Sequence, residues 1–291
     1  MRGISYLMSE LPTLSPAVGT QVEPADTTPV RGASGQRVRQ VIRFLPTLLL
    51  PLAVLVVWQL YCSLADVDPT VLPTPTRVVS SLWDARDIAW THTWQTLQET
   101  LIGFAVSIVV AVALAVVMDQ VAWLRRALYP MLVGSQTIPV IAIAPLMIIW
   151  FGFGLLPKVL VIILVTFFPI VVALLDGFAA TEREAMNLLK TMGASRWQTF
   201  RLVRFPGALP YFFTGLRISA TYAVIAAIFA EYVGAYTGLG IWMSQSKSAF
   251  RTDLVFGAIA VSALVSVALF LLVALVSRIV MPWYHAARER S

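Results

Sequence analysis

The stretch Thr181–Pro206, TEREAMNLLKTMGASRWQTFRLVRFP, is a polar segment inside an otherwise apolar chain. Thr181 and Glu184 form a T-x-x-E capping box, which predicts that a short helix begins here. Gly193 suits the left-handed backbone conformation that commonly ends a helix. Apolar stretches flank the segment on both sides, so we expect it to be a loop that stands out of a membrane. We call residues 181–206 the polar loop.

A second helix is expected in the same loop. Ser195 and Gln198 repeat the capping box as S-x-x-Q, and Pro206 is expected to stop the helix. Each helix has apolar residues spaced along one face. These residues are Met186, Leu189 and Met192 in the first helix and Trp197, Phe200 and Val203 in the second.

Composition indicates an integral membrane protein. Of 291 residues, 58% are hydrophobic and 12% are charged, whereas a soluble domain carries about 25% charged residues. Because only helices and closed barrels satisfy the backbone inside a bilayer, the long apolar stretches predict an all-α membrane bundle. Cys62 is the single cysteine, which excludes an intrachain disulfide and a cysteine metal cluster.

Uncharged stretches of about 20 residues predict where the chain crosses the bilayer. One apolar region, residues 127–157, is too long for a single straight helix and contains Pro130, Pro139 and Pro145 in its interior, so we expect a broken span there. The six expected spans are residues 44–64, 100–118, 127–150, 159–175, 210–233 and 254–277.

The remaining segments complete four predicted parts. Residues 1–42 are polar and predict a disordered cytoplasmic tail, and residues 282–291 a second cytoplasmic tail. Residues 43–90 hold the first span and an extracytoplasmic surface segment, and residues 91–281 the main transmembrane domain. Apolar positions at helical spacing predict a short amphipathic helix in the surface segment: Val78, Val79, Leu82 and Trp83.

The distribution of positive charge predicts the orientation. Six spans place both termini on one side, and arginine and lysine concentrate in the tails and loops of that side. The positive-inside rule therefore predicts cytoplasmic termini, a cytoplasmic polar loop and a location in the cell membrane. The net charge of +6 needs no nucleic-acid partner, and a DNA-binding helix-turn-helix is excluded because membrane spans hold both ends of the loop.

The polar loop resembles the EAA loop of binding-protein-dependent ABC importer permeases. Gly193 is followed by nine residues and then by Val203-Arg204-Phe205-Pro206, in register with the family pattern of E-A-A, glycine and I-x-L-P. The E-A-A position reads Asn187-Leu188-Leu189, which removes the usual glutamate, although Glu184 lies one helical turn upstream. A basic helix pair lying on anionic lipid is the alternative interpretation of the loop alone.

Further motifs extend the resemblance over residues 70–280, and they are similar to the nitrate, sulfonate and taurine branch, which includes thiamine-pyrimidine-precursor importers. In chain order they are Leu72-Pro73, Ile138-Pro139, Ala144-Pro145-Leu146, Trp150-Phe151-Gly152, Gly193-Ala194-Ser195-Arg196, Thr214-Gly215-Leu216-Arg217, Ala230-Glu231, Gly238-Leu239-Gly240 and Thr252-Asp253.

The resemblance implies a type I importer permease that alternates its access between the two sides. It implies cytoplasmic ABC ATPase subunits, an extracytoplasmic solute-binding protein and a second permease copy, most simply a homodimer, all in contact with membrane lipid. The residues expected to contact the ATPase are Glu184, Met186, Asn187, Leu189, Gly193, Ala194, Ser195, Trp197, Phe200 and Pro206. No cofactor or metal is expected.

Polar and aromatic residues at membrane depth are candidates for lining a solute path. Arg217 is a charge inside a span and a functional candidate by default, although it can also snorkel to the surface or bond to carbonyl groups. Glu231 is expected to form a structural pair or an outer gate. Gln136 and Trp150 are further candidates, each of which can equally be a helix contact or an interfacial residue.

The sequence does not suggest catalysis by this chain. The dipeptide Gly-Lys does not occur, so the phosphate loop that holds ATP is absent and ATP hydrolysis is expected on another subunit. The two histidines, His92 and His285, lie outside the expected spans, which leaves an intramembrane hydrolase without a positioned base. A stand-alone carrier or channel without an ATPase remains the alternative function.

We predict that an impermeant thiol reagent labels a cysteine placed at Ser248 in intact cells. Cysteines at Ser195 and Ser291 should stay unlabelled until the membrane is opened, with Cys62 replaced beforehand in each variant. Labelling of position 195 from outside would reverse the predicted orientation.

Overall fold

The computed structural model describes residues 33–181 and 183–284. Its secondary structure within these ranges is helical, with no strand among the described residues. The chain divides within its first helix, α1 (Ala33–Leu64), into residues 1–53 and residues 54–291. Residues 1–32 and 285–291 of the predicted tails lie outside the description, whereas residues 33–42 are helical and belong to α1.

Four helical stretches among the described residues are long and apolar enough to cross a membrane. They are α3 (Arg86–Gln120), α6 (Leu155–Ala179), the continuous stretch Arg196–Gly234 and α11 (Thr252–Val280). The first predicted span contains a shorter apolar helix, Leu49–Leu64. Six spans therefore remain a prediction.

The predicted broken span is a pair of helices with a sharp bend. Helices α4 (Ala122–Ser135) and α5 (Val140–Phe151) pass the membrane test together and bend by 101° at the break between them. Pro139 caps α5, and a proline at this position cannot donate a helical hydrogen bond and disfavours a helical residue before it. The pair is a broken span or a re-entrant loop.

The surface segment contains the predicted amphipathic helix. Helix α2 (Pro75–Asp84) begins after Thr74, whose hydroxyl accepts a hydrogen bond from the amide of Arg77, and it buries Val78. Helix α3 begins at Arg86 and contains the whole of the predicted span of residues 100–118, so the helix extends 14 residues before it. Residues 86–99 look polar enough for a loop, but Thr96 and Glu99 among them are fully buried against other helices.

Helices α3, α6 and α9 (Phe205–Gly234) form the core of the second unit. A Cβ atom built on Gly215 of α9 would lie 2.6 Å from Cβ of Ala173 and 2.7 Å from the carbonyl oxygen of Pro169, so α6 can approach this closely only because residue 215 is glycine. At the same level the buried Ser219 hydroxyl donates to the carbonyl oxygen of Thr166 at 2.7 Å.

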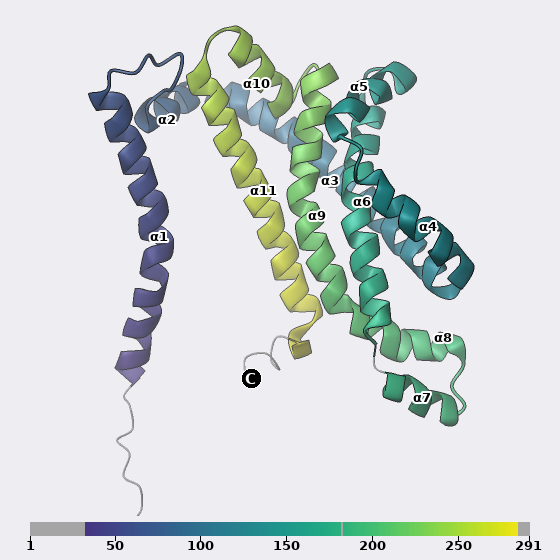
Figure 1. The fold of residues 1–291 in the computed structure, drawn as a ribbon. Helices are drawn as coiled ribbons and strands as arrows, with labels where there is room; N and C mark the ends of the chain where they lie inside the picture. The colour runs from purple at the N-terminus through teal and green to yellow at the C-terminus, as the bar shows by residue number, and fades with distance from the viewer. Residues whose placement is uncertain (1–32, 182, 285–291) are drawn as a thin grey trace, which may run out of the picture. The chain divides into compact units, whose positions relative to one another are not determined.

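The elements at the two ends of α9 define the regions that matter for function. At one end lie α7 (Arg183–Thr191), α8 (Arg196–Thr199) and the π-helical turn η1 (Phe200–Arg204). At the opposite end lies α10 (Leu239–Ser248), as Figure 1 shows.

Candidate functional site

The hairpin α7–α8 confirms two predictions about the polar loop. The amide of Ser195 donates to Oε1 of Gln198 at 2.7 Å, and the amide of Gln198 donates to Oγ of Ser195 at 3.2 Å, which completes the second capping box. Gly193 has φ +80, the left-handed conformation expected between the helices. No atom lies within 4 Å of a Cβ built there, so the requirement for glycine is conformational and not steric.

The first short helix of the loop is confirmed and one other prediction is wrong. Helix α7 begins at Arg183, two residues after Thr181, whose hydroxyl donates to the carbonyl oxygen of Gly177 at the end of α6 at 3.2 Å. Pro206 does not stop the second helix, because the chain continues through η1 into α9.

The π-helical turn explains why the helix can pass Pro206. The amide of Phe205 donates to the carbonyl oxygen of Phe200, five residues earlier, so the backbone widens by one residue just before the proline. Proline then occupies the first turn of α9, where its missing amide hydrogen is tolerated.

The apolar surface of the hairpin differs from the predicted docking face. Met192 is 75% exposed and Trp197 is 66% exposed, and Leu188 and Leu202 are also exposed. Phe200 was expected on this face, which is wrong: it is only 6% exposed and packs between the rings of Phe178 and Phe205.

The remaining residues predicted to contact the ATPase lie on the same hairpin. The ring of Phe200 stacks on the ring of Trp197 with 5.7 Å between the ring centroids, and so it supports the exposed tryptophan ring. Met186, Leu189 and Ala194 are half-buried, whereas Glu184, Asn187 and Ser195 are exposed.

An ion pair that sequence reasoning missed joins the hairpin to α3. Both terminal nitrogens of Arg204 donate to the carboxylate of Asp119, at 2.7 and 2.8 Å, and one also reaches the carbonyl oxygen of Phe178 at 3.3 Å. The side chain of Asp119 is 2% exposed. The sequence did contain a signal for this ion pair, because an acidic residue follows the second predicted span and an arginine lies in the polar loop.

The four candidate path residues are not brought together. Gln136 is exposed at the break between α4 and α5, and Trp150 is exposed on α5. Arg217 and Glu231 both lie on α9, but 14 residues of helix separate them by about 21 Å. One terminal nitrogen of Arg217 donates to Oγ of Ser277 on α11 at 3.0 Å, which is a helix-to-helix contact.

Glu231 is fully buried near the α10 end of α9. Its carboxylate accepts hydrogen bonds from the hydroxyl of Thr96 at 2.7 Å and from the amide of Gly240 at 2.8 Å. Close by, Lys158 of α6 forms an ion pair with Glu99 of α3 at 2.5 Å. The predicted structural role of Glu231 agrees with these contacts, although its partners are neutral groups.

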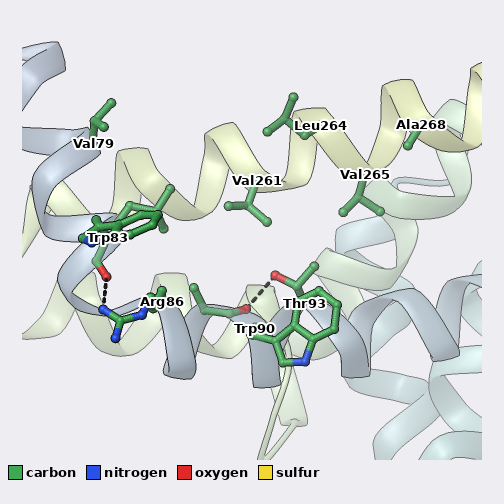
Figure 2. A pocket seen from close by; sticks show the side chains of 11 residues that line it. Val79, Trp83, Arg86, Trp90, Thr93, Val261, Leu264, Val265 and Ala268 are labelled. Atoms are coloured by element: carbon green, nitrogen blue, oxygen red, sulfur yellow. Dashed lines mark hydrogen bonds between the residues drawn. The ribbon is translucent and has the colours of Figure 1, made fainter.

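An apolar groove of about 520 Å³ runs between α2, α3 and α11. Figure 2 shows Trp83, Arg86 and Trp90 on one wall and Val261, Leu264, Val265 and Ala268 of α11 on the other. The guanidinium of Arg86 donates to the carbonyl oxygen of Trp83 at 3.3 Å, and further along α3 the hydroxyl of Thr93 donates to the carbonyl oxygen of Ala89 at 2.6 Å.

Comparison with known proteins identifies the family. Residues 103–285 match the binding-protein-dependent transport system inner membrane component. The chain belongs to this family. A riboflavin transport system permease protein of Chloroflexus aurantiacus is 38% identical over 88% of this chain and 98% of its own length. A formylaminopyrimidine transport permease protein of Halalkalibacterium halodurans is 38% identical over 82% of this chain and 95% of its own length.

More distant relatives share the same architecture. The taurine transport system permease protein of Escherichia coli is 30% identical over 79% of this chain and 86% of its own length. An inward-facing structure of the MetNI methionine ABC transporter matches with a TM-score of 0.52 and 22% identity, over 64% of this chain and 94% of that chain, which shows the fold alone.

Membership of the family establishes the broad function. The chain is the membrane permease subunit of an ABC importer, and it is not an enzyme, because ATP is hydrolysed on a separate ATPase subunit. The family also implies a solute-binding protein as a partner. The stand-alone carrier, which was the alternative, is set aside by these matches.

We predict that Asp119→Ala and Arg204→Ala each lower the thermal unfolding midpoint of the purified importer, because each leaves a charged partner unpaired. The double variant should lose less than the sum of the two single losses, since residues in direct contact are energetically coupled. Arg201→Ala, at an exposed neighbouring arginine, is the control and should have no effect. Additive losses would show that the two side chains act independently.

Proposed function

We propose that the α7–α8 hairpin is the surface through which the ATPase subunits move the spans. The continuous helical stretch Arg196–Gly234 carries this proposal, because the second helix of the hairpin continues through η1 into α9, the helix that is expected to cross the membrane. A displacement of α8 therefore acts on the span directly, without a flexible linker.

The exposed chemistry of the hairpin supports docking of a protein. Met192 and Trp197 are large, exposed and apolar, and exposed apolar patches mark interaction sites. The capping box and the glycine bend hold these side chains in a fixed arrangement. Glu184, Asn187 and Ser195 surround them with polar groups, which is the usual composition of an interface rim.

The assembly that we propose is a homodimer in the cell membrane with both termini in the cytoplasm. Helix α5 supports a second copy, because Ile141, Ile149 and Trp150 are exposed along it and a single bundle leaves them uncovered. The cytoplasmic assignment follows from the arginines of the polar loop and from the position of the ATPase. Membrane lipid is the proposed occupant of the groove in Figure 2, whose walls belong to two spans.

The solute that we propose is an uncharged planar nitrogen heterocycle of the flavin or aminopyrimidine class. Support comes from the names of the two relatives at 38% identity, against 30% for the taurine permease. Two cationic side chains at the helix contacts are already paired with carboxylates: Lys158 with Glu99 and Arg204 with Asp119. A sulfonate would have to compete with an acid for each of these two cations, whereas a neutral ring needs no cation.

We predict that Gly193→Val abolishes ATP-dependent uptake, because a β-branched residue is strongly disfavoured at φ +80 and the hairpin must change shape. Gly193→Asn is the matched control and should retain uptake, since asparagine tolerates the left-handed conformation. Both variants should reach the membrane in normal amounts, as no neighbouring atom is displaced.

The measurements are uptake and co-purification of the ATPase subunit. Met186→Asp should act like Gly193→Val by placing a charge beside the docking surface. Normal uptake and normal ATPase retention in both variants would contradict a coupling role for the hairpin.

We predict that the partner solute-binding protein binds riboflavin or formylaminopyrimidine and does not bind taurine. Calorimetry on the purified binding protein measures this, because that protein makes the first selection of solute. Uptake of the bound compound by proteoliposomes that contain the whole importer then tests transport. Binding of taurine without binding of either heterocycle would replace the proposed solute class.

A further inference from the structure

The glycine-rich turn between α9 and α10 is bound by three side chains. The amide of Gly238 donates to Nδ1 of His92 at 3.0 Å, the amide of Leu239 donates to the hydroxyl of Thr96 at 2.8 Å, and the amide of Gly240 donates to Glu231 at 2.8 Å. These are the amides at the start of α10, which have no acceptor inside the helix. Two of the three acceptors lie on α3, and the third lies on α9.

The turn leaves no room for larger residues. A Cβ atom built on Gly238 would overlap the carboxylate of Glu231, and one built on Gly240 would overlap the carbonyl oxygen of Ile228. Both glycines are therefore required by close approach, and Gly238 also has φ +131. The backbone of the turn lies directly on Glu231.

The first turns of α10 are also packed against α3. Leu239 is fully buried and Trp242 is 5% exposed. The ring of His92 stacks on Trp242 with 5.7 Å between centroids and 3° between planes. Because hydrogen bonds and ring packing both fix it, this end of α10 has a defined position on α3 and α9.

We propose that Glu231 is a positioning residue that fastens α10 to α9, so that α10 moves together with the span whose other end carries α8. Helix α9 has 30 residues and a length of about 45 Å. Glu231 lies in its last turn. The inference rests on the proposed coupling through the α7–α8 hairpin and adds the element that receives the movement.

The hydrogen bonds indicate which substitutions break this attachment. Glu231→Met fills a similar volume but leaves the amide of Gly240 without its acceptor and removes the bond from the hydroxyl of Thr96 to α9. Glu231→Gln can preserve the attachment, because its amide oxygen can accept from Gly240 and its nitrogen can donate to Thr96. The proton of the Thr96 hydroxyl can then turn to the carbonyl oxygen of His92, 3.1 Å away.

The test measures the distance between α9 and α10 in the complete importer. Spin labels are attached to cysteines at Val233 of α9 and Ser248 of α10, which are both exposed, with Cys62 replaced. Pulsed electron paramagnetic resonance is recorded without nucleotide and after trapping with ATP and vanadate. The parent protein and Glu231→Gln should give one narrow distance that is the same in both states.

In Glu231→Met the distance should become broad and should differ between the two nucleotide states. A narrow, unchanged distance in Glu231→Met would overturn the proposal. If that variant does not assemble, the same distance is measured in Thr96→Val and Thr96→Ser. The distance should become broad in Thr96→Val and stay narrow in Thr96→Ser. A narrow distance in both variants overturns the proposal. Thr93→Val is the control, since the hydroxyl of Thr93 bonds only within its own helix at Ala89.

Gly193→Val in the labelled background separates this inference from the coupling proposal. Loss of uptake in Gly193→Val with a narrow distance in Glu231→Met overturns the attachment and leaves the coupling role intact. Normal uptake in Gly193→Val overturns the coupling role, and with it the movement assigned to α10. The distance measured without nucleotide then still shows whether Glu231 holds α10 on α9.

Discussion

The close packing of α6 on α9 is the contact on which the rest of the described bundle depends. In a membrane the helices gain little from hydrophobic burial against one another, so association relies on close van der Waals packing and on hydrogen bonds between helices. Gly177 and Gly215 provide the close approach, since a Cβ atom on either would lie within 3 Å of the facing helix. Thr166 and Ser219 provide the polar contact. The hairpin at one end and α10 at the other are both attached to this pair.

Buried charge in the described spans fixes the ends of the helices. A charged side chain at membrane depth is costly unless it is paired or solvated. The pair Arg204–Asp119 lies beside the hairpin, and the pair Lys158–Glu99 lies near the α10 end. Sequence reasoning singled out Arg217 as the charge inside a span, whereas these two ion pairs, which it did not predict, join neighbouring helices. An uncharged solute is consistent with that arrangement.

The sequence correctly predicted the local features of the polar loop. The second capping box and the bend at Gly193 were correct, because both follow from residues a few positions apart. The exposure of Phe200 and the helix stop at Pro206 were predicted wrongly, and the extension of α3 back to Arg86 was not predicted, because the sequence alone does not show how these segments pack. The partners of the polar residues before position 100 lie on α9 and at the start of α10, far away in the sequence.

The position of Arg204 gives the proposed movement a direction. Arg204 lies at the last residue of the π-helical turn, between the hairpin and the long helix, and its two hydrogen bonds to Asp119 fix this point on α3. Helix α9 runs from this point to Glu231, about 40 Å further along its axis, so in the proposed movement a rotation of α9 about Arg204 would displace Glu231 more than the residues beside Arg204. If α10 is fastened there, the largest movement is delivered to the residues at the opposite end of the bundle from the ATPase.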